Sequence, residues 1–319
     1  MNSSLMNALK KNAAEHEAIR HLRLDTEKTL FLEDGSDVAD QPADASYKAV
    51  FINTDGAPAA FLLASNPKSC DLIARNTAKA RLARHKLNNS LGTVILTPIA
   101  ESRFQGLSWA IFPLKRLPAE KGWAWRYQKL MLTPQLLGWL AGVVGHTKRA
   151  LTSEDAGQRL CEPLQKLATD RQFSSGIRSA AQKALARYEQ GLWKPQTVLV
   201  HNDLWKGNIL LPLSEERRKK YPEFYIIDWA GSNSVGFPFF DLMKLMHNLG
   251  LPGIVMRQVI KKHCRVLNFE LEDAMSSLLA AIADLGEHLE YFPRPRYIAM
   301  ATELIECLAS VINYTIVST

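Results

Sequence analysis

The sequence predicts an α+β protein of two lobes, in which a small β-rich N-terminal lobe precedes a larger, mostly helical C-terminal lobe. Between residues 29 and 65, short apolar and β-branched runs alternate with turn residues, as in strands joined by tight turns. From about residue 118 onwards, apolar residues recur at helical spacing, and two short strand-like runs interrupt that pattern. We therefore place the lobes at residues 1–115 and 116–319.

The N-terminal lobe is expected to hold a small sheet and one main helix. Its elements, in order, are a helical stretch at 1–25, strands at 29–32, 47–52 and 59–64, a helix at 71–87, and strands at 94–98 and 108–113. The Asn-Thr-Asp-Gly sequence at 53–56 is typical of a hairpin turn. Asp71 is placed to cap the start of the helix. The strands and the main helix give the order β-β-β-α-β-β.

The C-terminal lobe is expected to consist of helices around two acid-bearing strands. Helical spacing occurs at 133–149, 155–169, 174–190 and from 239 to the end of the chain. The apolar run 198–200 leads to Asp203, and the run 225–227 leads to Asp228. A polar loop, 212–223, separates the two runs. Each strand therefore delivers a carboxylate at its end.

The composition is that of an ordinary folded protein. Of its 319 residues, 47% are hydrophobic and 22% are charged, which is sufficient for a sizeable core. The N-terminus has no signal-peptide pattern, and no apolar run reaches the roughly 18–20 residues that a membrane span needs. The cysteines lie far apart and suggest no disulfide framework; they are Cys70, Cys161, Cys264 and Cys307. We therefore expect a cytoplasmic protein without a transmembrane segment.

The chain is basic, with a formal net charge of +7 and a pI of about 9.2. Such a balance suits nucleotide phosphates, nucleic acid or an anionic membrane surface, and does not choose among them. The densest basic run, 215–220, begins with two acids and is typical of a solvated loop. No nucleic-acid-binding motif is present, so we expect no nucleic-acid partner. Peripheral membrane contact stays open.

The sequence HNDLWKGN at 201–208 carries most of the chemical information in the chain. Phosphoryl transfer needs a carboxylate that orients the attacking hydroxyl, and oxygen ligands for a metal ion that bridges the phosphates. Asp203 is the candidate base, and Asn208 and Asp228 are the candidate metal ligands. Gly207 relaxes the turn between them. The pattern therefore indicates phosphoryl transfer.

HNDLWKGNILL, followed by YIIDW, resembles the catalytic core of the aminoglycoside phosphotransferase and choline kinase-like family, which has a protein kinase-like fold. The resemblance covers residues 198–242. It implies that Asp203 is the catalytic base and that Asn208 and Asp228 bind Mg²⁺. It also implies structural, loop-bracing roles for His201 and Asp241, although Asp241 also suits a helix cap.

The resemblance further implies that ATP is the cofactor and that the N-terminal lobe covers it. A kinase-like lobe usually has a Lys on its third strand and a Glu on the next helix, but residues 59–64 contain no Lys and residues 71–87 contain no Glu. Lys48 and Lys68 are candidates to replace the strand Lys as phosphate contacts; alternatively, each is an ordinary surface lysine. By analogy, adenine is placed where the strand 108–113 runs into the connection between the lobes, at Ile111, Phe112 and Leu114.

Other residues near the motif have two interpretations each. Lys206 is a candidate phosphate contact or a solvent-exposed cation, and Trp205 either lines the acceptor pocket or packs. The turn at 33–36 is the nearest match to a phosphate loop, although a plain turn explains it better. The acids Asp284, Glu287 and Glu290 suit a cationic acceptor or a solvated helix face.

The function expected first is ATP-dependent phosphorylation of a small-molecule hydroxyl: an amino alcohol, a sugar or an aminoglycoside-like acceptor. A kinase-fold binding or regulatory protein with weak or no catalysis is the second interpretation, because the Lys–Glu pair is missing. A sugar kinase acting on envelope glycans is the third, since Trp123 and Trp125 lie next to Arg126 in a basic chain. The sequence does not identify the acceptor.

Overall fold

The structure is a computed structural model that describes residues 3–31, 46–213, 223–289 and 292–315. The turn at 33–36, the basic run 215–220 and Glu290 lie outside the described residues. The chain divides into two compact units. Unit 1 comprises Met1–His85, Thr93–Leu117 and Ile209–Ala230, and unit 2 comprises Lys86–Gly92, Pro118–Asn208 and Gly231–Thr319.

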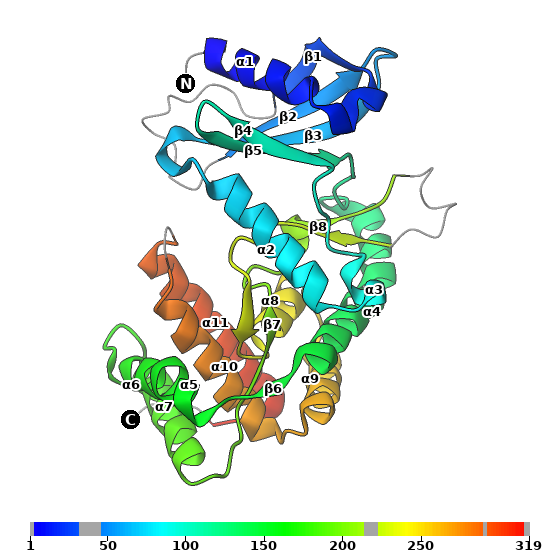
Figure 1. Cartoon of the computed structure of the whole chain (residues 1–319). Helices are drawn as coiled ribbons and strands as arrows, with labels where there is room; N and C mark the ends of the chain where they lie inside the picture. The colour runs from blue at the N-terminus through cyan, green and yellow to red at the C-terminus, as the bar shows by residue number, and fades with distance from the viewer. Residues whose placement is uncertain (1–2, 32–45, 214–222, 290–291, 316–319) are drawn as a thin grey trace. The chain divides into compact units, whose positions relative to one another are not determined.

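Unit 1 contains a five-stranded antiparallel sheet with the strand order β1-β2-β3-β5-β4 (Figure 1). Its strands are β1 (Leu24–Phe31), β2 (Ser46–Asn53), β3 (Pro58–Ser65), β4 (Ala100–Phe104) and β5 (Leu107–Pro113). Its helices are α1 (Ser3–Ala14), the 3₁₀ turns η1 (Glu17–Leu22) and η2 (Pro67–Ser69), and α2 (Leu72–Lys86), whose last residue belongs to unit 2. The predicted hairpin turn after β2 is present. The order β-β-β-α-β-β is also present, although its fourth strand is not the predicted one.

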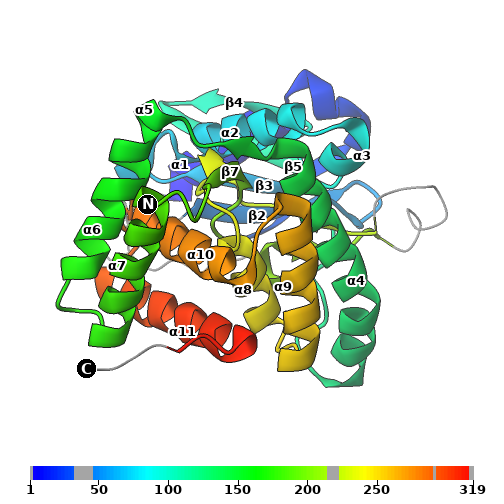
Figure 2. The same cartoon turned by 90° about the horizontal axis from the view of Figure 1, so that it is seen from below.

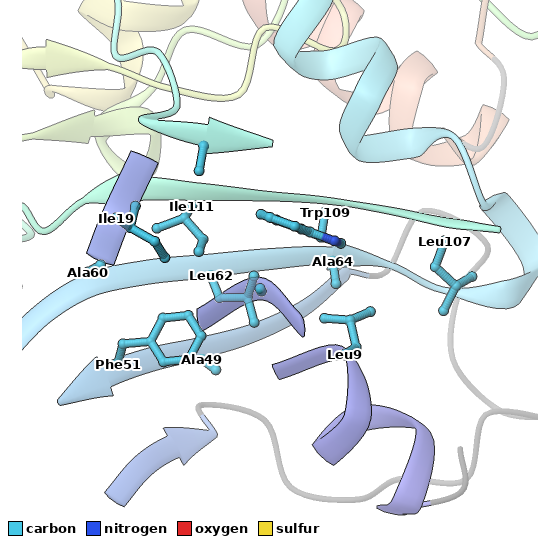
Figure 3. Close-up of a cluster of buried hydrophobic side chains, with 12 residues drawn as sticks. Leu9, Ile19, Ala49, Phe51, Ala60, Leu62, Ala64, Leu107, Trp109 and Ile111 are labelled. Carbon is cyan, nitrogen blue, oxygen red and sulfur yellow. The ribbon is translucent and has the colours of Figure 1, made fainter. Parts of the chain in front are cut away.

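One face of this sheet forms the core of unit 1, because burial alternates along much of β2 and β3. Figure 3 shows side chains of three strands meeting Leu9 of α1 and Ile19 of η1. The strand residues are Ala49 and Phe51 of β2, Ala60, Leu62 and Ala64 of β3, and Leu107, Trp109 and Ile111 of β5. The N-terminal helix therefore covers this face of the sheet and completes its core.

The strand predicted at 94–98 is wrong. Ile95 makes only an isolated bridge to Ile226, and β4 lies further along the chain in the more polar sequence AESRF. The apolar run 94–96 is buried. The Leu96 N–H donates to the Ile226 carbonyl, and the Ile226 N–H donates to the Val94 carbonyl. Ile226 belongs to β9 (Tyr225–Ile226), which pairs with β8 (Ile209–Leu210). The apolar signal therefore marks a buried connection beside β9.

Unit 2 is mostly helical, as predicted for the C-terminal lobe. Its helices are α3 (Asn89–Gly92), α4 (Gly122–Thr147), α5 (Ser153–Ala156), a π-helical turn η3 (Gly157–Cys161), α6 (Glu162–Thr169), α7 (Ser175–Glu189), a 3₁₀ turn η4 (Lys206–Asn208), α8 (Phe240–Asn248), α9 (Gly253–Leu267), α10 (Leu271–Gly286) and α11 (Arg294–Ile312). A three-stranded sheet contains β6 (Arg149–Ala150), β7 (Gln196–Val200) and β10 (Asn233–Gly236) in the order β10-β7-β6.

Helix α10 is the centre of the helical packing in unit 2. Its residues from Asp273 to Ala283 are all buried, as expected for a helix that is covered on every side. Figure 2 shows α6 and α7 on one side of it, α9 on the other and α11 next to it. These contacts form the helical framework of unit 2.

Helix α4 begins at Gly122, well before the start predicted at residue 133. Proline is typical of the first turn of a helix and is unfavourable in its interior. Here Pro134 lies inside α4, preceded by a Thr133 hydroxyl that bonds back to the Lys129 carbonyl at 2.7 Å. The segment 122–132 is therefore helical despite the proline that follows it.

The two compact units differ from the predicted lobes in one main respect. Residues 209–230 group with unit 1, whereas the sequence placed them in the C-terminal lobe. Backbone bonds explain the difference: Ile226 pairs with the segment around Ile95, and Arg116 and Leu211 exchange two hydrogen bonds. The division of functional roles between the lobes stays a prediction. Among the described residues, the helices are all too short or too polar to cross a membrane.

The approach of β10 to β7 gives a first testable prediction, at Gly236. A Cβ atom at this position would lie 2.2 Å from Cγ2 and 3.2 Å from Cβ of Val200, which is buried at the end of β7. Gly236→Ala should therefore lower the free energy of unfolding by about 1–3 kcal/mol, the usual cost of overpacking. Urea-induced unfolding followed by circular dichroism measures the difference.

Gly138→Ala is the matched control for this prediction. Gly138 is exposed in the interior of α4, and a Cβ atom there meets nothing within 4 Å. Alanine is favoured over glycine in helices by roughly 0.5–1 kcal/mol, so this variant should be as stable as the wild type or more stable. Equal destabilisation by both substitutions would contradict the close contact between β10 and Val200.

Candidate active site

The predicted catalytic loop, residues 201–208, directly follows β7 in unit 2. His201 is buried, and its Nδ1 accepts a hydrogen bond from the backbone N–H of Asp203 at 3.2 Å. Between them, Asn202 has a φ of 64°, in the left-handed region that few residues other than glycine adopt. The chain therefore turns sharply after β7, and the His201 ring supports the backbone of Asp203.

Asp241 supports the same turn from the first turn of α8. Its two carboxylate oxygens accept hydrogen bonds from the backbone N–H groups of His201, at 2.6 Å, and Asn202, at 2.8 Å. Asp241 is buried, and burial raises its pKa to about 6, although these two bonds and the Lys244 ammonium lower it. Asp241 therefore bonds to the backbone of the 201–208 loop, and its role as a brace stays a prediction.

The Asp203 carboxylate is held at both oxygens. Oδ1 accepts from the Lys244 ammonium at 2.5 Å, and Oδ2 accepts from the Asn208 side-chain amide at 2.8 Å. The same Asn208 nitrogen also donates to the Asp203 carbonyl at 2.8 Å, so the five-residue interval closes into a compact loop. The Asp203 side chain is 42% exposed, and Asn208 is buried. An oriented and accessible carboxylate suits proton transfer from a hydroxyl.

Lys206 points towards the start of α4. Its ammonium donates to the Glu120 carbonyl at 2.7 Å and lies 4.1 Å from the centre of the Trp125 ring. A phosphate contact by Lys206 stays a prediction. Gly207 is required for space: a Cβ atom there would lie 2.5 Å from the Trp205 ring. The Trp205 ring therefore packs over Gly207, although the side chain is partly exposed.

Asp228 belongs to unit 1 and follows β9 by two residues. Its φ is 61°, again in the left-handed region, and the residue is exposed. Asn76 of α2 donates to Asp228 Oδ1 at 3.2 Å and accepts from the backbone N–H of Trp229 at 2.9 Å. Lys79, one turn further along α2, donates to the Ala230 carbonyl. Helix α2 therefore contacts three consecutive residues at the predicted metal-binding strand.

The nucleotide contacts predicted for the N-terminal lobe lie in unit 1. Lys48 is on β2, opposite Leu63 of β3, and Lys68 is an exposed residue of η2. Ile111 is fully buried in the core, and its carbonyl accepts from the Ile99 N–H at 2.8 Å, so this residue is committed to the sheet. Phe112 and Leu114 are partly buried at the end of β5 and just beyond it. Their role beside adenine stays a prediction.

The two described acids proposed for a cationic acceptor have basic neighbours. Glu287 forms an ion pair with Lys166. Burial raises the pKa of Asp284, and the nearby Arg159 lowers it. These contacts reduce the negative charge that the two acids offer to a cationic acceptor.

The structure brings His201, Asp203, Asn208 and Asp241 together through direct hydrogen bonds within unit 2. Sequence reasoning missed Lys244, although its spacing of three residues from Asp241 on a helix places both on one face. It also passed over Asn76, because a polar residue among the polar positions of α2 carries no distinct signal.

Comparison with known families decides the class of protein. Residues 42–262, more than half of the chain, match the model of the APH phosphotransferase enzyme family. The chain belongs to this family. The expected relationship to aminoglycoside phosphotransferases and choline kinase-like proteins is thereby confirmed. The match includes the whole segment 198–242 on which the expectation was based.

Solved structures show the same fold. One is a thermostable mutant of aminoglycoside phosphotransferase APH(4)-Ia in a ternary complex with AMP-PNP and hygromycin B. Its sequence is 12% identical and its TM-score is 0.56, and the match covers 97% of this chain and 99% of that chain. The apo form is 13% identical with a TM-score of 0.51, covering 92% and 96%. No curated protein sequence matches the chain. At these identities the structural likeness shows the fold alone, and the α+β, protein kinase-like class is confirmed.

Proposed function

We propose that this phosphotransferase family member uses ATP to phosphorylate a hydroxyl group of a small molecule, such as an amino alcohol, a sugar or an aminoglycoside-like compound. The observation that carries the proposal is the arrangement around Asp203. Its accessible carboxylate is oriented by Lys244 and Asn208 on a loop whose backbone is bonded to the buried Asp241. Such a carboxylate is suited to orient a hydroxyl and to accept its proton.

In the proposed reaction, Asp203 accepts the proton of the acceptor hydroxyl. The hydroxyl oxygen forms a bond to the γ-phosphorus of ATP, the bond from that phosphorus to the β–γ bridging oxygen breaks, and ADP leaves with the bonding electrons. The Lys244 ammonium, 2.5 Å from Asp203 Oδ1, holds the carboxylate in one orientation. Asp241 and His201 hold the loop backbone, so that Asp203 needs little reorganisation during the reaction.

Asn208 and Asp228 are the proposed ligands of Mg²⁺, and their chemistry fits this ion because both offer hard oxygen atoms. The Asn208 amide nitrogen is bonded to Asp203, which leaves its carbonyl oxygen as the candidate ligand atom. Asn208 directly precedes Ile209, which pairs with Ile226 two residues before Asp228. When bound, the cation would neutralise charge on the transferred phosphoryl group.

For the nucleotide, we propose that the backbone from Phe112 to Leu114 bonds the adenine. Pro113 has no N–H, so Leu114 is the first residue after Phe112 that can donate a backbone hydrogen bond. Lys48 and Lys68 are the proposed phosphate contacts from the N-terminal region. Because β3 has no Lys and α2 has no Glu, the manner of phosphate binding differs from that of a protein kinase.

A second candidate function, phosphorylation of an envelope glycan carried by a lipid, has one supporting observation. Trp123, Tyr127 and Leu130 follow one another at helical spacing on α4 and are 79%, 58% and 71% exposed. Arg126 and Lys129 lie between them in the sequence. An apolar stripe next to basic residues suits the surface of an anionic membrane. Such an acceptor therefore belongs among the compounds to be tested.

The proposal is tested by measuring ADP release with Mg²⁺-ATP and a panel of hydroxyl acceptors. The panel contains amino alcohols, hexoses, aminoglycosides and glycolipids in anionic vesicles. We expect release that depends on both Mg²⁺ and one acceptor class, and that is lost in Asp228→Asn. Thermal stabilisation by Mg²⁺-ATP without transfer to any acceptor would favour a kinase-fold binding protein instead. Absence of any effect of ATP would contradict nucleotide binding altogether.

A further inference from the structure

Helix α2 contacts residues 228–230 directly, although it lacks the Glu that a kinase-like fold usually has there. In a kinase-like fold, the acidic residue of this helix pairs with a strand lysine that binds phosphate. Here β3 and α2 lack both residues, yet α2 uses Asn76 and Lys79 to bond directly to Asp228, Trp229 and Ala230. The helix is therefore connected to the proposed metal ligand without an intermediate ion pair.

The Asn76 side chain makes two different hydrogen bonds with consecutive residues. Its amide nitrogen donates to Asp228 Oδ1 at 3.2 Å, and its amide oxygen accepts from the Trp229 N–H at 2.9 Å. Among side chains, only Asn and Gln have a donor and an acceptor on one planar amide group. A carboxylate at this position would retain the bond to Trp229 and repel Asp228.

The backbone at Asp228 requires such support. A φ of 61° in a residue other than glycine is unfavourable, and it persists only where the surroundings hold it. Trp229, which follows, is fully buried, so the position of the segment is fixed on that side. The Asn76 amide holds the exposed Asp228 side chain on the other side and occupies Oδ1 from one direction.

We infer that Asn76 is a positioning residue that orients the Asp228 carboxylate for the Mg²⁺ of a bound nucleotide. The inference rests on the proposed function, because it assumes that Asp228 binds this metal. Asn76 thus connects α2 to the proposed metal ligand, whereas β3 has no Lys and α2 has no Glu to form the usual pair. Hydrogen-bond partners of metal ligands typically change metal affinity or activity by about 10–100-fold when they are mutated.

The test compares Mg²⁺-dependent ADP binding in the wild type, Asn76→Asp, Asn76→Leu and Asp228→Asn. Calorimetric titrations of ADP at a series of Mg²⁺ concentrations give the half-saturating Mg²⁺ concentration. We expect Asn76→Asp and Asn76→Leu to raise it by about 10–100-fold, with little change in ADP binding in the absence of the metal. Hydrogen exchange at the Trp229 amide should become faster in Asn76→Leu, which loses the acceptor, and less so in Asn76→Asp, which keeps it.

Ala78→Asp is the control for added charge, since Ala78 is an exposed residue of the same helix. It should leave the half-saturating Mg²⁺ concentration within about twofold of the wild type, because surface charges have small effects. Thermal unfolding of each variant checks that it is folded. A strong effect of Asp228→Asn with none of Asn76→Asp or Asn76→Leu would overturn the inference about Asn76 alone. Absence of Mg²⁺-dependent binding in the wild type would overturn the proposed function and this inference together.

Discussion

Asp203→Asn should lower kcat by about 10²–10⁴-fold and leave the KM for ATP nearly unchanged, because general-base catalysis contributes about this factor. Asparagine has nearly the shape of aspartate and keeps one oxygen that can accept from Lys244 or Asn208, so the loop should stay folded. What it loses is the charge and the ability to take a proton at neutral pH. Steady-state kinetics with the best acceptor of the panel measures both constants.

Asp25→Asn provides the control, since Asp25 forms a surface ion pair with Lys28 at 3.1 Å on β1. It should retain the full kcat, since Asp25 is not part of the loop that carries Asp203 and a surface ion pair has a small effect. A residual kcat in Asp203→Asn above one tenth of the wild-type value would contradict the role of Asp203 as the base. A large increase in the KM for ATP with an unchanged kcat would indicate instead that Asp203 acts in nucleotide binding.

The family, the fold class and the expected site motif could be predicted because the necessary information is local. Asp203 and Asn208 lie five residues apart, and their type and spacing indicate one kind of chemistry. Asp241 follows at the start of an amphipathic helix, where its position in the motif drew attention to it. The apolar runs 47–52 and 59–64, separated by a turn sequence, likewise predicted strands.

Residues that act through long-range contacts could not be predicted in the same way. Asn76 is separated from Asp228 by 152 positions in the sequence, and no local pattern distinguishes it from a surface residue of α2. The apolar run around Ile95 indicated burial correctly, but periodicity cannot tell a ladder strand from a single bridge. The predicted start of α4 was too late, and the helix runs through Pro134 against the local preference of that residue. For Asn76 and Ile95, the deciding partner lies elsewhere in the chain.

Asp241→Asn should raise the free energy of unfolding and lower kcat at neutral pH. Asp241 is a buried carboxyl group whose pKa is raised from 3.8 to about 6. A raised folded-state pKa means that the protonated form is the better one for the fold. Its stabilising contribution is complete below about pH 3.8 and is lost as the pH rises through about 6. A shift of about two pH units corresponds to about 3 kcal/mol.

Asparagine does not titrate, so the variant should gain about 3 kcal/mol of unfolding free energy relative to the wild type between pH 4 and pH 7. Urea unfolding of both proteins at several pH values measures this change. The matched control is Asp170→Asn, since Asp170 forms an ion pair with Arg294 at 2.5 Å near the surface. A gap between Asp241→Asn and the wild type that is independent of pH would contradict the raised pKa.

Activity should move in the opposite direction at neutral pH. The ionised Asp241 offers one acceptor oxygen to the His201 N–H and another to the Asn202 N–H, whereas an amide offers only one. The loop that carries Asp203 should therefore lose its fixed position, and kcat should fall by about 10–100-fold, as small displacements of a reacting group do. The wild type should likewise lose kcat as the pH falls through about 6, because protonation removes the same acceptor, and this limb should be missing in the variant. On this prediction, the charge that weakens the folded state at neutral pH is the same charge that orients the loop carrying Asp203.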